Sequence, residues 1–82
     1  MTRWVERQAN LFGQMMERVG ADPSVAVRER FEGGFAAACR RCLACPSTTD
    51  CQRWLEAGGA GAAPSFCPNA AFLNHVRKPA TN

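Results

Sequence analysis

The sequence predicts a small all-α bundle of four to five short helices, and three observations lead to that fold class. The chain has 82 residues, which is enough for one small domain spanning residues 1–82. Alanine is abundant and β-branched residues are few, a composition that favours helix over sheet. Near the amino terminus, apolar residues recur at three-, four- and seven-residue spacings, as they do on one face of a helix.

The first helix is expected from about Thr2 to Val19. Its apolar face comprises Trp4, Val5, Leu11, Phe12, Met15, Met16 and Val19. Thr2 can cap the start of this helix, and Gly20 is well placed after its end. We expect Trp4 and the two methionines to pack in the core.

The second helix is expected from Pro23 to about Phe31. Asp22 followed by Pro23 is typical of an N-cap residue and a first helical residue. The apolar residues that this helix presents are Val25, Val27 and Phe31.

A tight turn at Gly33 and Gly34 separates the second helix from the third. The third helix is expected to begin at Phe35 and to run towards Cys42. Pro46 ends it, because proline disfavours helical geometry in the residue before it.

The fourth helix is short and is expected over residues 51–57. The segment Ser47–Asp50 forms a cluster of capping residues before it, and Gly58 ends it. Residues 58–63 are glycine and alanine, so we expect a flexible loop there.

Ser65 or Cys67 is expected to cap a fifth helix, with Pro68 near its first turn. The inner face of this helix comprises Ala71, Phe72 and Val76, and Pro79 ends the helix. Residues 78–82 are expected to be a frayed tail.

The overall composition excludes several classes of protein. With 46% hydrophobic and 21% charged residues, the chain is expected to fold rather than to be disordered. No apolar run approaches the roughly 20 residues that span a bilayer, and the first residues lack the apolar segment of a secretory signal. We therefore expect a soluble, cytoplasmic protein. The sequence contains no carboxylate pair, phosphate-binding glycine loop or catalytic triad, so neither enzymatic activity nor a small-molecule substrate is expected.

Five cysteines lie at positions 39, 42, 45, 51 and 67. An odd number of clustered cysteines in a reducing compartment favours a metal or redox site over disulfides. Since the core of so short a chain is marginal, four ligands from separate helices would also hold the bundle together. One alternative is a set of scattered structural cysteines. Another is a redox dithiol at Cys42 and Cys45, which is disfavoured because the pair is expected at a helix C-terminus, where the dipole does not activate a thiol.

The cysteine spacing bears on the kind of centre. Zinc sites usually take two close pairs of cysteines, whereas here one C-x2-C pair is followed by two single cysteines. The run Cys39-x2-Cys42-x2-Cys45 and the final Cys67-Pro68 resemble the ligation of bacterial ferredoxins. The spacing therefore favours a [4Fe–4S] cluster, with Zn²⁺ as the alternative. It leaves open whether Cys39 or Cys51 completes the set of ligands.

A family resemblance is visible around the cysteines. The sequence contains the pattern Arg41-Cys42-x2-Cys45-x5-Cys51-x2-Trp54-Leu55, followed by Cys67-x-Asn69. Over roughly residues 11–77 the chain resembles the bacterial domain of unknown function 6455. The four cysteines of that family match Cys42, Cys45, Cys51 and Cys67, so the resemblance implies these four as the ligands of the metal or cluster. It leaves Cys39 outside the set and implies no biochemical role.

The other candidate residues are expected to have structural roles. His75 is the single histidine and should be an ordinary residue at a helix end rather than a ligand. Arg40, Arg41 and Arg53 are expected to offset the thiolate charge, and the alternative is a docking patch for an acidic partner. Trp54 is expected to pack over the site as an apolar cover.

These features together predict a small cytoplasmic [4Fe–4S] protein for electron transfer or redox sensing with a protein partner. The alternative is an interaction module held together by zinc, without redox activity. The formal net charge is +3, and four thiolates around either centre reduce it to about +1. So small a charge, without a recognition-helix pattern, does not favour binding to nucleic acid.

Overall fold

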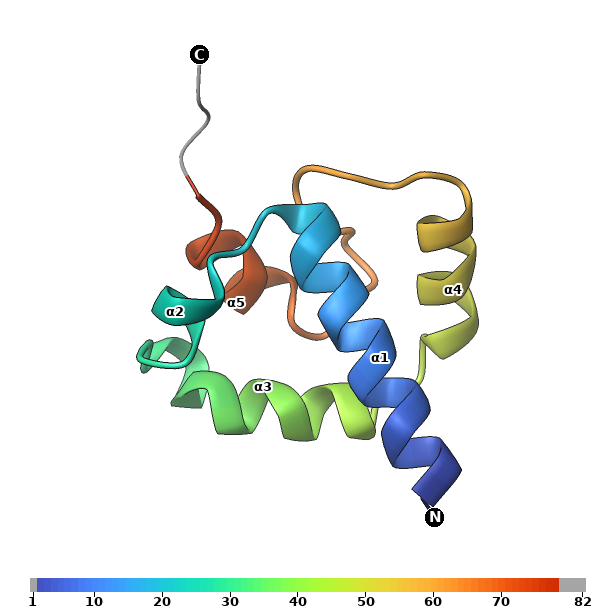
Figure 1. Ribbon diagram of the computed structural model, residues 1–82, viewed down its shortest axis with the longest axis horizontal. Helices are drawn as coiled ribbons and strands as arrows, with labels where there is room; N and C mark the ends of the chain where they lie inside the picture. Colours follow the sequence, from blue (N-terminus) through green and yellow to red (C-terminus); the bar gives the residue numbers. More distant parts are fainter. Residues whose placement is uncertain (1, 79–82) are drawn as a thin grey trace.

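The computed structural model describes residues 2–78, which form five α-helices and one 3-10 turn (Figure 1). The elements in chain order are α1 (Thr2–Val19), α2 (Pro23–Ala26), η1 (Phe31–Gly33), α3 (Gly34–Leu43), α4 (Thr48–Glu56) and α5 (Ala70–His75). Within residues 2–78 there is no strand, and an isolated bridge pairs Ala21 with Arg77. The expected all-α fold class is therefore confirmed. None of the helices in this part of the chain is long and apolar enough to cross a membrane.

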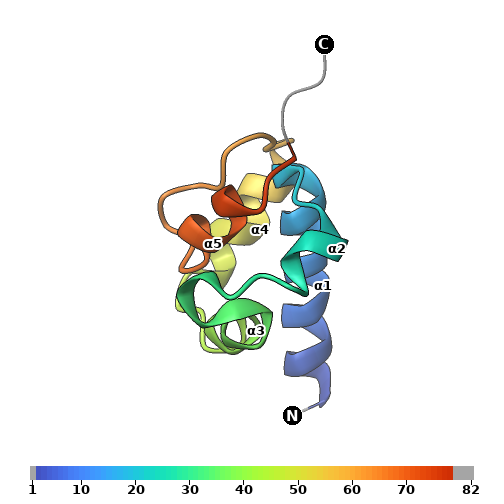
Figure 2. The same ribbon diagram turned by 90° about the vertical axis from the view of Figure 1, so that its left-hand side faces the viewer.

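Helix α1 is the element against which the rest of the fold packs. It contacts α3, α4 and α5. In Figure 2 α1 runs vertically while α3 is seen almost end-on, so the two helices cross steeply. The bounds expected for this helix are confirmed: the helix ends at Val19, and the backbone N–H groups of Gly20 and Ala21 both donate to the carbonyl of Met16. Gly20 has a φ of +81°, the left-handed conformation that favours glycine after a helix end.

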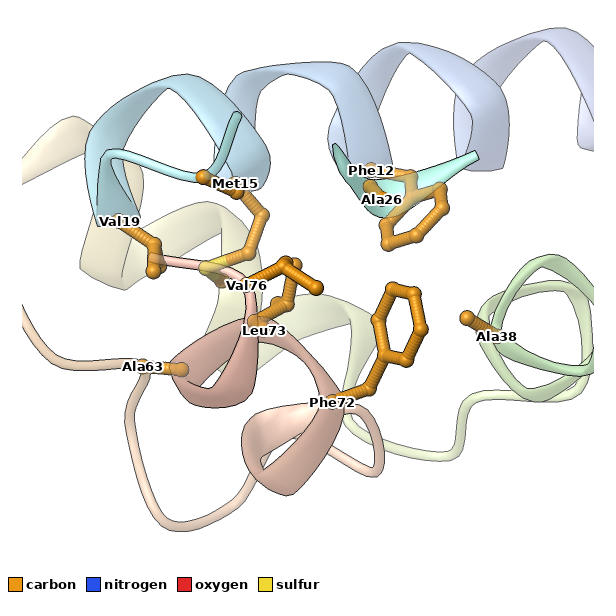
Figure 3. Packing of buried hydrophobic residues seen from close by; sticks show 10 residues of the cluster. Phe12, Met15, Val19, Ala26, Ala38, Ala63, Phe72, Leu73 and Val76 are labelled. Atoms are coloured by element: carbon orange, nitrogen blue, oxygen red, sulfur yellow. The ribbon is translucent and has the colours of Figure 1, made fainter. Parts of the chain in front are cut away.

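The core lies where α1 faces α5. Figure 3 shows Phe12, Met15 and Val19 of α1 directed towards Phe72, Leu73 and Val76 at the end of the chain. Small residues complete this core, since the side chains of Ala26 on α2 and Ala38 on α3 are fully buried. Alanine at these two positions allows α2 and α3 to approach closely, which is how two short elements are packed against α1.

The second helix is shorter than the sequence predicts. Asp22 is its N-cap, as expected, and its side chain accepts a hydrogen bond from the N–H of Ser24. The helix ends at Ala26, however, and Val25, Val27 and Phe31 are exposed. The prediction that these three residues are presented to the core is wrong, because residues two apart on a helix do not share a face. Phe31 instead begins the turn η1.

The first turn of α1 also differs from the prediction. Trp4 and Val5 were expected in the core, but they are 44% and 47% exposed. The amino-terminal turn of α1 extends beyond the other helices in Figure 1, so its apolar residues have little to pack against. The indole N–H of Trp4 donates to the carbonyl of Leu43, the last residue of α3, at 2.9 Å.

Helices α3 and α4 lie close to their predicted positions. The tight turn at Gly33 and Gly34 is confirmed, since both residues have positive φ values of 85° and 78°. Helix α4 begins three residues before the predicted start, so Thr48 and Asp50 belong to its first turn rather than to a preceding cap. Gly58 follows its end with a φ of +82°, as expected.

The start of the fifth helix was predicted too early. Residues 65–69 form turns, in which the N–H of Cys67 donates to the carbonyl of Pro64, and the helix begins only at Ala70. Phe72 and Val76 are buried as predicted, whereas Ala71 is exposed and Leu73 takes the inward position. The predicted end at Pro79 and most of the predicted frayed tail lie outside the described residues.

Candidate functional site

Four of the five cysteines line one small cavity. Cys42 lies in the last turn of α3, Cys45 between α3 and α4, Cys51 in α4 and Cys67 in the turn before α5. The remaining wall is mostly apolar and comprises Leu11, Phe12 and Met15 of α1 together with Phe66 and Pro68. The cavity has a volume of about 20 Å³, which is room for about one water molecule. The fold therefore gathers cysteines from three separate segments against one side of α1.

Backbone groups around the cavity contact the sulfur atoms. The N–H of Ser47 donates to Sγ of Cys45 at 3.3 Å. The Sγ–H of Cys42 donates to the carbonyl of Gln8 at 3.5 Å. A hydrogen bond from the backbone of Asn69 lowers the pKa of Cys67, although burial raises it by more. Two of the four cysteines therefore accept a backbone hydrogen bond of the kind that stabilises a thiolate.

Burial keeps these thiols protonated at neutral pH. Burial is the main cause that raises the pKa of Cys42 to about 12, and the neighbouring thiols of Cys45, Cys51 and Cys67 raise it further. The pKa of Cys51 rises to about 11, again chiefly through burial. Since metals bind the thiolate, a metal that enters this cavity has to displace protons, and its affinity will increase with pH.

The donor set fits a thiolate-bound centre. Soft thiolate ligands select zinc and iron–sulfur clusters over hard cations such as Mg²⁺, and the cavity wall contains no carboxylate. Within residues 2–78, no three cysteine, histidine or acidic side chains lie close enough to hold a single metal ion. The four cysteines share a cavity but do not converge on one point. Their assignment as ligands stays a prediction.

Cys39 is placed differently from the other four cysteines. It is absent from the wall of the four-cysteine cavity and lies instead beside Met16 and Phe35 in a groove between α1 and α3. Cys42, one turn further along α3, lines both hollows. Cys39 is therefore close to one member of the group without sharing its cavity.

Two buried polar side chains hold the segments that carry the cysteines, and both also line the cavity. Gln8 on α1 is 1% exposed, and its Nε2 donates to the carbonyl of Cys42 at 2.6 Å. The side chain of Asn69 is 2% exposed, donates to the carbonyl of Ala38 and accepts from Nε of Arg41. Gln8 was missed in the sequence. The signal was a polar residue four positions before Phe12, inside an otherwise apolar helix face.

Replacing Gln8 with leucine tests its role at the site. The variant loses the donor to Cys42 and the acceptor that Thr48 contacts, so we expect the free energy of unfolding to fall by about 1–2 kcal/mol. The control is Gln14→Leu, because Gln14 is exposed on the same helix and contacts only Asn10. Thermal melts followed by circular dichroism would compare the two. Equal losses would contradict a specific role for Gln8.

The remaining candidates have structural roles in part. Trp54 does not line the cavity, so its predicted role as a cover over the site is wrong. Its ring packs directly on the backbone of Gly59, where a Cβ would have no room. Arg41 donates to Asn69 and to the carbonyl of Glu32, whereas Arg40 and Arg53 are exposed. His75 stacks on Phe31, and its Nε2 lies 3.2 Å from Glu29.

A comparison with known families places almost the whole chain. Residues 2–79 match the model of a family described as a family of unknown function (DUF6455). No curated protein and no solved structure shows a significant match to the chain.

Proposed function

The chain belongs to the family of unknown function DUF6455, and we propose that it is a [4Fe–4S] protein that transfers or senses electrons together with a protein partner. The family match confirms the resemblance stated from the sequence. The observation that supports the cluster is the arrangement of four thiols around one apolar cavity without convergence on a single point. In a [4Fe–4S] cluster each cysteine binds a different iron, so its four thiolates stand further apart than those around one ion.

The surroundings of the sulfur atoms suit such a cluster. Hydrogen bonds to the ligand sulfurs and exclusion of solvent are the means by which a protein sets a cluster's reduction potential. Here the N–H of Ser47 contacts Cys45, and the apolar side chains of Phe12, Met15 and Phe66 form much of the wall. When bound, the cluster would supply one-electron chemistry. The protein's part is to hold the four thiolates and to limit the access of water.

A zinc-held interaction module is the second candidate. The observation in its favour is the cavity volume of about 20 Å³, which suits one ion better than a four-iron cluster. To bind Zn²⁺ the four sulfurs would turn inward, whereas to bind a cluster they would turn outward. Cys45 and Cys67 lie in turns rather than in helices, so they have the freedom to move in either direction.

Purification without oxygen followed by metal analysis tests the proposal. For the cluster we expect a brown protein with about four iron and about four inorganic sulfide per chain. A colourless protein with about one zinc per chain would overturn the cluster and support the zinc module. A chain that carries neither metal in stoichiometric amount would overturn both candidates. We propose no enzymatic activity, and no binding to nucleic acid or membranes.

A further inference from the structure

A second surface feature lies outside the four-cysteine cavity. Two hollows of about 360 and 450 Å³ share Gly13, Met16 and Phe35 and so form one groove along α1. One wall is α1 itself. The other wall comprises α3 at one end, through Cys39 and Leu43, and α2 with the segment after α5 at the other. The groove follows α1 from residue 5 to residue 20, about 22 Å of helix.

The groove exposes apolar side chains that the fold leaves without partners. Val5 and Leu43 line its first half, and Val27 lines its second half. These three are 47%, 36% and 60% exposed, and Trp4, which bonds to Leu43, stands beside them. A continuous apolar groove of this kind on a small protein marks an interaction surface.

The charges beside the groove differ between its two walls. On α1, Glu17 lines the groove, and Glu6 lies next to Val5. On the opposite wall, Lys78 lines the groove, and Arg40 lies next to Cys39. All four side chains are exposed, and within residues 2–78 none of them forms an ion pair. One wall is therefore acidic and the other basic.

We propose that this groove binds the same groove of a second copy of the chain, giving a two-fold symmetric dimer. A two-fold axis perpendicular to the floor of the groove places each acidic wall over the basic wall of the other copy. It also reverses the direction of the helix. Arg40 lies beside the first half of α1 and Lys78 bonds to Gly20 at its end, so reversal brings Glu17 to the partner's Arg40 and Glu6 to the partner's Lys78. The proposal does not depend on the proposed function.

Sedimentation velocity of the purified chain tests the dimer. At about 100 μM we expect twice the 8.9 kDa mass of one chain. Val5→Glu should raise the dimer Kd at least about tenfold, since it places a charge in the apolar contact. The matched control is Val25→Glu, which changes an exposed valine outside the groove and should leave the dimer intact. A monomer at this concentration, or equal effects of the two variants, would overturn the proposal.

Charge reversal tests the arrangement of the two copies. Glu17→Arg and Arg40→Glu should each raise the Kd about tenfold or more, because like charges would then face each other. Combining the two substitutions in one chain should restore most of the affinity, since the pair is re-formed with its signs exchanged. Failure of the combined variant to recover, with helicity unchanged by circular dichroism, would overturn the proposed pairing.

Discussion

Replacing any one of four cysteines with serine is expected to abolish stoichiometric metal binding and to unfold much of the chain. The four are Cys42, Cys45, Cys51 and Cys67, which share one cavity. In a small domain the free energy of metal ligation is also folding free energy, about 10–16 kcal/mol for structural zinc in zinc-finger peptides. Loss of one ligand should therefore remove the link between α3, α4 and the turn before α5. Metal analysis and far-ultraviolet circular dichroism of each variant would measure both losses.

The control for these variants is Cys39→Ser, which should retain metal and helicity. Cys39 lies in the groove between α1 and α3 rather than in the cavity. The opposite result, loss of metal in Cys39→Ser and its retention in Cys51→Ser, would show that the ligands are Cys39, Cys42, Cys45 and Cys67. That outcome would favour the ferredoxin-like spacing over the set implied by the family resemblance.

The elements that the sequence predicts well are those with strong local signals. The first helix has a long apolar period, and Gly20 lies directly after its end, so both of its ends were found. The second helix has neither a long period nor a stop signal, and it was extended too far. Its length depends on tertiary packing, since only Ala26 has to reach the core. The exposure of Trp4 likewise depends on how far α1 extends past α3, which no local pattern encodes.

The candidate site was predictable to a similar extent. Spacing alone indicated a four-cysteine centre, and the chain does bring Cys42, Cys45, Cys51 and Cys67 to one cavity. The walls of the cavity were not predictable. Trp54 was expected over the site because it lies three residues after Cys51, yet Phe66 and Pro68 cover it from the loop before α5. Contacts across such a loop depend on the whole fold rather than on neighbouring residues.

Replacing Phe72 with alanine should unfold the metal-free chain while the metal-loaded chain stays folded at a lower melting temperature. Phe72 is fully buried, and its ring lies between Phe12 and Ala38 in Figure 3. Removing a buried phenylalanine ring costs about 3–5 kcal/mol, which is much of the 4–12 kcal/mol or so expected for a domain of this size. Bound metal stabilises only the folded state, so it should offset that loss.

Thermal melts of both forms, followed by circular dichroism, measure the effect against a matched control. Phe31→Ala removes a phenylalanine that is 38% exposed and stacks on His75, so its cost should stay near 1 kcal/mol in either form. If metal-free Phe72→Ala kept its native helicity, α5 would contribute little to the core. If the metal-loaded variant unfolded as completely as the metal-free one, the four-cysteine site would not hold the turn before α5 against the rest of the chain. The difference in melting temperature between the two forms therefore measures how strongly the centre links this segment to the fold.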